Sequence, residues 1–255
     1  KAGTPYFILG AGANILMADK GFRGLVIHNQ ADTARLLPSH QLWAEGGAII
    51  ADLIELGRVH DLSGLEHFVG IPSSVGGAIW QNLHFLSPDR QTTCYISDCV
   101  ISASILTEDG NVETVNKNFF DFGYDDSILH HREIVVLEVT FQLEPKPMGK
   151  IEAQLQANMA WRLEHQPQLW EYRSCGSVFK KIEGVGAGRL IDQAGLKGKQ
   201  IGQAQVSTKH ANYIVNLGGA SASDVLALIE LVQKTVTIET GHHLEPEIRI
   251  VGEKN

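Results

Sequence analysis

The chain has 255 residues, of which 44% are hydrophobic and 20% charged, a composition typical of folded globular proteins and unlike that of a disordered chain or a fibre. Its 21 Lys and Arg against 29 Asp and Glu give a net charge of −8, which argues against nucleic acid and against a membrane surface as partners. The three cysteines form neither a disulfide framework nor a metal pair, so we expect a cytoplasmic protein that binds no metal.

The first half of the chain predicts mainly strands, with one helix. Strands are expected over residues 6–9, 25–28, 41–44, 101–106, 112–115 and 134–143. Asp109-Gly110 separates two of these runs and is typical of a hairpin turn. A helix is expected over residues 48–59, because Ile49, Leu53 and Leu56 recur at helical spacing.

The segment Glu144-Pro145-Lys146-Pro147 predicts a domain boundary, because its two prolines favour an extended connector. One domain is therefore expected over residues 1–145 and a second over 146–255. Beyond the boundary we expect helices over residues 150–164 and 188–194 and from Ser221, and strands over 177–180, 201–206, 213–216 and 247–251. Asp224 stands where it would complete a capping box with Ser221. The mixed order indicates the α+β class, with two domains.

Two segments of the first half are rich in small residues. The turn Gly10-Ala11-Gly12-Ala13-Asn14 follows a predicted strand and exposes backbone N–H groups that can face a phosphate. It lacks the third glycine of the dinucleotide-binding fingerprint, so a tight loop is the alternative. The segment Gly70-Ile71-Pro72-Ser73-Ser74-Val75-Gly76-Gly77-Ala78 adds two hydroxyls to its glycines. It suits a phosphate or flat cofactor, or else begins an ordinary helix with Val75, Ala78 and Ile79 packed inward.

Together with four later blocks, these segments resemble the UDP-N-acetylenolpyruvoylglucosamine reductases. The later blocks span residues 174–180, 187–198, 210–216 and 244–249 and stand in the family's order. The resemblance covers nearly the whole chain, and the direct run from Ser127 to Pro145 is similar to the shorter, second type of this reductase. It implies an FAD-binding domain of the vanillyl-alcohol-oxidase type, whose N-terminal part would lie before residue 1, and a C-terminal α+β substrate-binding domain.

The resemblance also implies an oxidoreductase of peptidoglycan precursor synthesis. NADPH would reduce FAD, and the flavin would pass hydride to the enolpyruvyl group of a UDP-sugar, giving UDP-N-acetylmuramate for the cell wall. The family's FAD-binding positions match Gly10, Ala11, Gly12, Ala13, Asn14, Gly70, Ile71, Pro72, Ser73, Ser74, Gly76, Gly77, Ala78 and Asn82. Its substrate-binding positions match Tyr124, Lys180 and Lys181.

Two residues match the family's proton donor and its glutamate. Ser177 would protonate the carbon beside the substrate carboxylate, which hydride addition makes strongly basic. Glu247, if kept protonated, would donate a hydrogen bond to that carboxylate. The structural alternatives are a serine that caps a turn and a solvated strand face on which Glu245, Glu247 and Arg249 alternate.

The sequence departs from the family at several positions. Asp125 occupies the place of the catalytic arginine, and its negative charge would destabilise the developing carboxylate dianion. Lys181-Ile182 replaces an Asn-Pro pair, residues 83–95 replace a short glycine-rich stretch, and Ala13 replaces a common serine. His131 and Arg132 follow closely after Asp125 and are candidates to supply the missing positive charge.

Three functions are therefore open. The chain is an active reductase, or a catalytically impaired relative that binds a flavin or a UDP-sugar, or a different flavin oxidoreductase on the same fold. Asp125 and Lys181 favour the second and third, whereas the presence of both Ser177 and Glu247 favours the first, which we adopt. The sequence makes no prediction of oligomeric state.

Overall fold

The computed structural model describes residues 3–87, 91–182 and 184–253. Contacts between Cα atoms divide the chain into two compact units, each assembled from separate stretches. Unit 1 consists of Lys1–Tyr6, Ala13–Val26 and Arg162–Asn255, and unit 2 of Phe7–Gly12 and Ile27–Trp161. This division differs from the linear boundary predicted after residue 145, because it groups an N-terminal stretch with the C-terminal part and falls within helix α3 (Met148–His165). Both units mix helices and strands, and the α+β class is confirmed.

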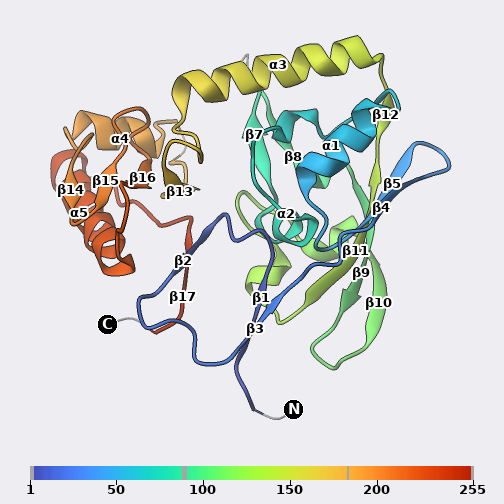
Figure 1. Ribbon diagram of the computed structural model, residues 1–255, viewed down its shortest axis with the longest axis horizontal. Helices are drawn as coiled ribbons and strands as arrows, with labels where there is room; N and C mark the ends of the chain where they lie inside the picture. The colour runs from blue at the N-terminus through green and yellow to red at the C-terminus, as the bar shows by residue number, and fades with distance from the viewer. Residues whose placement is uncertain (1–2, 88–90, 183, 254–255) are drawn as a thin grey trace. The chain divides into compact units, whose positions relative to one another are not determined.

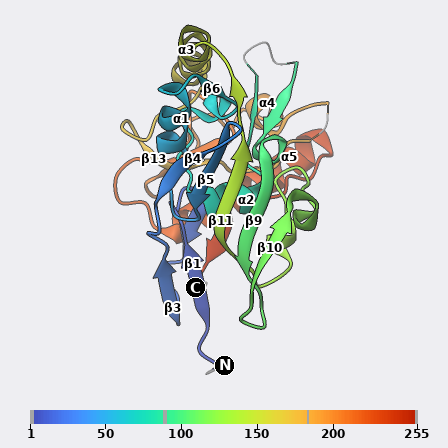
Figure 2. The ribbon, with the colours of Figure 1, turned by 90° about the vertical axis from the view of Figure 1, so that its right-hand side faces the viewer.

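Unit 2 is built on a five-stranded antiparallel sheet in the order β10-β9-β11-β5-β4 (Figure 2). Its strands are β4 (Ala34–Leu37), β5 (Gln41–Glu45), β9 (Val100–Leu106), β10 (Val112–Asn116) and β11 (Val135–Gln142). The predicted hairpin is confirmed, since Val112 pairs with Leu106 across the Asp109-Gly110 turn. Leu42 and Ala44 of β5 are fully buried and alternate with half-buried residues, as expected for a strand with one face on the core.

Two helices contact this sheet. Helix α1 (Ile50–Arg58) buries Ile50, Leu53 and Ile54, which share one helical face. Helix α2 (Val75–Gln81) begins at the N-cap Ser74, whose Oγ accepts a hydrogen bond from Gly77 N at 3.3 Å. The prediction that this segment begins a helix with Val75, Ala78 and Ile79 packed inward is thus confirmed.

Shorter elements complete unit 2. They are β6 (Leu62–Ser63), η1 (Glu66–Phe68), β7 (His84–Leu86), β8 (Thr93–Tyr95), η2 (Ile96–Asp98), η3 (Lys117–Phe120), η4 (Ile128–His130) and β12 (Glu144–Pro145). The proline-rich connector is packed rather than free, because β12 pairs with β6 and α3 begins directly after it.

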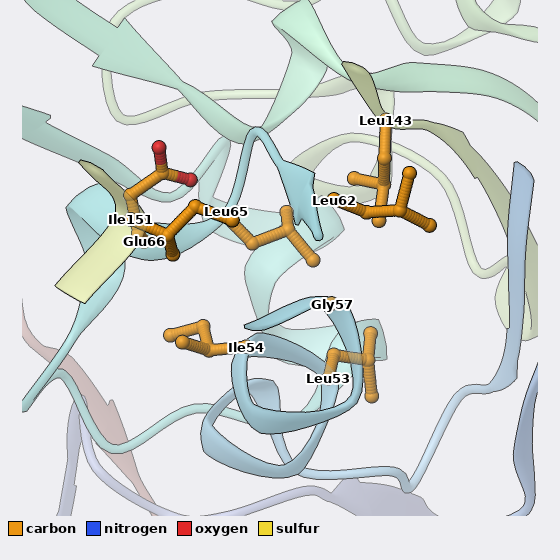
Figure 3. Close-up of a pocket in the computed structure, with 8 residues that line it drawn as sticks. All are labelled: Leu53, Ile54, Gly57, Leu62, Leu65, Glu66, Leu143 and Ile151. Atoms are coloured by element: carbon orange, nitrogen blue, oxygen red, sulfur yellow. The ribbon is translucent and has the colours of Figure 1, made fainter. Parts of the chain in front are cut away.

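A narrow, mainly apolar pocket lies where α1, β6, η1 and α3 meet (Figure 3). Its lining residues are Leu53, Ile54, Gly57, Leu62, Leu65, Glu66, Leu143 and Ile151. Glu66 is the charged member, and its carboxylate is 3.1 Å from Lys146 Nζ. It also accepts hydrogen bonds from Ser63 Oγ and from Gly64 N at 2.7 Å. The carboxylate is therefore a structural anchor between these elements.

Unit 1 contains a four-stranded antiparallel sheet in the order β13-β16-β15-β14. Its strands are β13 (Arg173–Ser177), β14 (Gln200–Ile201), β15 (Ala204–Val206) and β16 (Tyr213–Asn216). Helix α5 (Ala222–Thr240) contacts β14 and β15, and α4 (Ala187–Gln193) contacts α5 (Figure 1). The predicted capping box of Ser221 and Asp224 at the start of α5 is confirmed.

The N-terminal stretch joins unit 1 through a parallel ladder. Strand β2 (Ile15–Met17) pairs with β17 (Arg249–Val251). Asp19 then accepts hydrogen bonds from Ala222 N at 2.7 Å and from Ser223 N at 2.9 Å, at the first turn of α5. Two strands flank this stretch in the sequence, β1 (Tyr6–Leu9) before it and β3 (Leu25–His28) after it, and they pair with each other.

Candidate functional site

The two glycine-rich segments approach each other in unit 2, at Gly10 and Ser74. A Cβ atom on Gly10 would lie 2.2 Å from Ser74 Oγ, so a side chain at this position would displace the hydroxyl that caps α2. Gly76 N donates to Gly46 O at 2.7 Å, which brings a third small-residue turn alongside. Ala11, Gly12 and Gly77 are exposed, so the backbone of both predicted segments is accessible. This cradle of backbone fits a cofactor that carries phosphates or a flat ring.

The Asn82 side chain stabilises neighbouring backbone and is not exposed. It ends α2 in the left-handed conformation, with φ of 46°. Its side chain is buried, donates to Gly123 O at 2.8 Å and accepts from Ser97 N at 3.4 Å. The sequence assigned Asn82 to the cofactor, and the structure shows a side chain engaged with the backbone of the 123–127 turn.

That turn carries the residues at the family's arginine motif. Asp125 is 1% exposed and accepts a hydrogen bond from the side-chain amide of Gln81. Tyr124 is 38% exposed, and its ring centroid is 4.6 Å from that of His84. Asp125 is thus held inside unit 2 by α2, whereas Tyr124 presents an accessible ring.

The two cations proposed to replace the arginine have acidic partners. Arg132 binds Glu108 through two hydrogen bonds, of 3.1 Å from Nε and 2.7 Å from Nη2. His131 Nε2 is 3.4 Å from a carboxylate oxygen of Asp126. The expectation that these residues supply a positive charge for a ligand is not supported, because Glu108 already neutralises Arg132.

Ser177 lies at the end of β13, opposite Tyr213 at the start of β16. The Ser177 side chain acts to lower the pKa of the Tyr213 hydroxyl, so the two side chains lie close together. Gly176, with φ of 78°, lies in the register shift between Ser174 and Ser177, so the ladder is interrupted just before Ser177. Just beyond, the Asn212 side chain accepts from Phe179 N at 3.0 Å and donates to Phe179 O at 2.8 Å. Ser177 is therefore positioned by a glycine on one side and by a buried amide clamp on the other.

Glu247 is brought beside this strand end by a neighbouring segment. Its N–H donates to Val178 O at 2.7 Å, and Lys180 N donates to Glu245 O at 2.9 Å. Asn14 Nδ2 also donates to Glu247 O, at 3.1 Å. The predicted serine and glutamate are thus on adjacent segments of unit 1.

The alternative of a solvated strand face does not describe this segment. Strand β17 begins only at Arg249, after Glu245 and Glu247, so the three side chains do not alternate along one strand. Glu245 pairs with Lys180, its Oε2 atom 3.7 Å from Nζ. Lys181 is exposed.

Tyr213 connects the serine to two charged groups. Burial raises the pKa of the Tyr213 hydroxyl, the charge of Glu247 raises it further, and the positive charge of Arg162 and the hydrogen bond with Ser177 oppose the rise. Burial lowers the pKa of the Arg162 guanidinium itself. A cation, two hydroxyls and a carboxyl thus gather in unit 1.

Sequence reasoning missed Arg162 and Tyr213. Tyr213 stands in a block that carries the family resemblance, but no role was assigned to it. Arg162 lies near the end of a predicted helix, where basic residues are common for reasons of helix stability alone, so it gave no signal. Among the described residues, no helix combines the length and apolarity that crossing a membrane requires, and no cluster of metal-ligating side chains is found there.

Comparison with known proteins agrees with this arrangement. Residues 1–116 match the FAD binding domain family, and residues 150–251 match the C-terminal domain of UDP-N-acetylenolpyruvoylglucosamine reductase. The UDP-N-acetylenolpyruvoylglucosamine reductases of Agathobacter rectalis and Pediococcus pentosaceus are each 40% identical over 98% of this chain and 81% of their own length. The crystal structure of the Thermus caldophilus reductase superposes with a TM-score of 0.83 at 32% identity, covering 98% of this chain and 86% of that one. The chain therefore belongs to the UDP-N-acetylenolpyruvoylglucosamine reductase family, with an FAD-binding domain followed by that family's C-terminal domain.

Proposed function

We propose that this chain catalyses the NADPH-dependent reduction of UDP-N-acetylglucosamine enolpyruvate to UDP-N-acetylmuramate, a step of peptidoglycan precursor synthesis. The observation that carries the proposal is the placement of Ser177, opposite Tyr213 across β13 and β16, beside the segment that bears Glu247. The names of the bacterial relatives support the same reaction. A cytoplasmic location stays a prediction.

The residues of unit 1 suit the second half of this reaction. FAD, when bound, would supply the hydride, taken from NADPH, that adds to the methylene carbon of the enolpyruvyl group. The electron pair of the double bond then moves to the carbon beside the carboxylate, which takes the Ser177 hydroxyl proton as a new C–H bond forms. Tyr213, whose pKa burial raises, stays protonated at neutral pH and can return a proton to the Ser177 oxygen. Glu247, if protonated, would donate a hydrogen bond to the substrate carboxylate.

Unit 2 would provide most of the flavin contacts. The exposed residues of segments 10–12 and 70–78 would hold the phosphates and the ring, and Ala13 and Asn14 remain predicted FAD-binding residues. Tyr124, Lys180 and Lys181 would contact the UDP-sugar.

Anaerobic stopped-flow spectroscopy tests the proposal by separating the two half-reactions. NADPH should bleach the flavin absorbance, and the enolpyruvyl sugar nucleotide should restore it. Replacing Ser177→Ala should leave the first step within about twofold and slow the second by ~10² or more, because only the second needs the proton. Ser39→Ala, at an exposed turn of unit 2, is the matched control and should change neither step.

The other candidate functions give different results. A protein that stays colourless with added FAD would contradict both the reductase and any other flavin oxidoreductase. Reduction that only oxygen reverses would indicate a different oxidoreductase. Binding of FAD and UDP-sugar without reoxidation by substrate would indicate an impaired relative, the outcome that Asp125 at the arginine position favours.

A further inference from the structure

The turn that leads into β16 is organised around His210, a residue to which the proposed function gives no role. Its backbone N–H donates to Ser207 Oγ at 3.3 Å, and its carbonyl oxygen accepts from Tyr213 N at 3.0 Å. Its side chain adds another bond, because Nδ1 accepts from Asn212 N at 3.2 Å. These three bonds close the turn at one residue.

The bond from Asn212 fixes the protonation state of the imidazole. A backbone N–H can only donate, so Nδ1 of His210 carries a lone pair and the ring is neutral, with its proton on Nε2. Protonation of Nδ1 would set a ring N–H against the N–H of Asn212, and the hydrogen bond between them would be lost. The closed turn therefore requires a neutral His210, and acid should loosen it.

The imidazole ring is packed against two elements of unit 1. Its centroid lies 4.9 Å from that of the Tyr213 ring, with an interplanar angle of 65°. A Cβ atom on Gly188, in the first turn of α4, would lie only 3.3 Å from His210 Cε1. Since α4 leaves the imidazole little space to move, the imidazole in turn limits the position of the Tyr213 side chain.

The residues that His210 holds both act on the strand that bears Ser177. Tyr213 is the partner of Ser177 in the register of β13 and β16. Asn212 binds both backbone groups of Phe179, two residues beyond Ser177. A shift of this turn would therefore move both supports of the predicted proton donor.

The charged groups on the elements around the imidazole are either engaged or exposed. Lys209 Nζ donates to a backbone carbonyl of α3 at 2.5 Å. On α4, Asp192 is 2.9 Å from Lys197 Nζ, and Arg189 is exposed. The titratable group of β16 is Tyr213, whose pKa is raised by burial, so it stays uncharged at neutral pH. We therefore expect the imidazole to be the group of this turn that changes its charge between about pH 5 and pH 8.

We propose that His210 is a positioning residue for the reduction proposed above. As a neutral imidazole it holds Tyr213 and Asn212 in place around Ser177, and its protonation loosens them and slows proton donation to the substrate. This inference rests on the proposed function, because the step that it affects is the protonation of the substrate carbon.

The protonation state of the ring gives a test that needs no turnover. In protein labelled with nitrogen-15 at histidine, long-range proton–nitrogen spectra distinguish a bare ring nitrogen from a protonated one. The signals of His210 are those missing from His210→Asn. We expect a bare Nδ1 and a protonated Nε2 at neutral pH. A ring with its proton on Nδ1, or one that is already charged at neutral pH, would overturn the proposal.

Two variants separate the acceptor from the ring. In His210→Asn the side-chain oxygen can accept from the same N–H two residues further on, and it does not titrate, so reoxidation at neutral pH should stay within about threefold of the unmodified rate. In His210→Phe the ring is kept and the acceptor is lost. The N–H of the buried Asn212 then has no partner in the turn, and reoxidation should be about tenfold slower.

The pH dependence is the readout that a merely structural role would not change. From about pH 8 to pH 5, reoxidation in the unmodified protein should fall about fivefold or more relative to His210→Asn, because only the former can be protonated at this position. His60→Asn, which replaces an exposed histidine just after α1, is the matched control and should follow the unmodified protein. Parallel pH profiles for the unmodified protein and His210→Asn would overturn the proposal.

Flavin reduction by NADPH shows whether a variant is damaged as a whole, and we expect it to stay within about twofold in both His210 variants. A variant that loses flavin or is reduced more slowly would mean that His210 supports the whole protein, and the proposal would be wrong. If the unmodified protein is not reoxidised by the enolpyruvyl substrate, the proposed function fails, but the spectra still show whether His210 is held neutral. If it turns over and both variants equal it at every pH, the function stands and this inference is wrong.

Discussion

In the proposed reaction Ser177 needs a neighbour to act as an acid. A serine hydroxyl is a weak acid in water, and we expect the Tyr213 hydroxyl, opposite it across the strand pair, to orient it and replenish its proton. We expect Tyr213→Phe to slow reoxidation of the reduced flavin by about tenfold, because orientation is lost while the serine remains. Stopped-flow measurement of both half-reactions checks this, with the exposed Tyr172→Phe as the control. Equal rates in the variant and the unmodified protein would show that Ser177 acts without Tyr213.

The sequence predicted the residues of the site unevenly. Ser177 and Glu247 carry motif positions, and the structure places them on adjacent segments. Tyr213 could not be predicted, because its closeness to Ser177 arises only when β13 pairs with β16. Arg132 was chosen for closeness in sequence, and its pairing with Glu108 on the neighbouring hairpin was equally invisible.

At the scale of elements, long periodic segments were predictable and short ones were not. Helices α1, α3, α4 and α5 and the β9–β10 hairpin lie where the patterns placed them. The strand expected over residues 201–206 is instead two, β14 and β15, because Gly202 turns the chain with φ of 54°. A strand was expected over residues 177–180, but β13 (Arg173–Ser177) ends at Ser177. Three-residue strands such as β2 contain too few residues to show an alternation.

The Asn212 side chain fixes the chain just beyond Ser177, so we expect it to affect both stability and the proposed reaction. Its amide satisfies both backbone groups of Phe179, two residues after Ser177. We expect Asn212→Ala to lower the free energy of unfolding by about 1–3 kcal/mol, because two buried backbone groups lose their partners. It should also slow reoxidation of the flavin by substrate, since the end of β13 is no longer fixed. Denaturant titration and stopped-flow kinetics measure the two effects.

A capping variant in the same unit separates those effects. Ser221→Ala removes the N-cap of α5 and should cost about 1 kcal/mol of stability. It lies in the helix cap rather than at Ser177, so reoxidation should proceed at the unmodified rate. If Ser221→Ala slows reoxidation as much as Asn212→Ala does, the clamp has no specific role in positioning Ser177.

At the scale of the whole molecule, neither unit is one continuous stretch of chain. Strand β2 pairs in parallel with β17, and Asp19 binds the first turn of α5, so residues near both ends of the sequence share unit 1. A boundary read along the sequence cannot represent such an arrangement, because a parallel pairing between distant segments leaves no local signal. The composition and the mixed order of elements were sufficient for the α+β class, which depends on local patterns.

Stability in acid should depend on the buried carboxylate of Glu66. Burial tends to raise the pKa of this carboxyl, but hydrogen bonds from Gly64 N and Ser63 Oγ and the ammonium of Lys146 together outweigh it and hold the pKa below its ordinary value. The unfolded chain therefore binds this proton more readily than the folded one. Its contribution to stability is complete above the unfolded pKa of about 4.3, and is lost as the pH falls through the lower folded value.

We therefore expect Glu66→Gln to lower the free energy of unfolding at pH 7 by about 1–3 kcal/mol, because the ammonium of Lys146 loses its partner and the charge-assisted hydrogen bonds weaken. The difference from the unmodified protein should shrink as the pH falls below 4, since protonation then removes the same charge from Glu66. Urea titrations across this pH range measure it. Glu108→Gln, which breaks the exposed pair with Arg132, is the control and should change stability little. A difference that stays constant from neutral to acid pH would mean that Glu66 stabilises unit 2 by packing alone and that its charge contributes nothing.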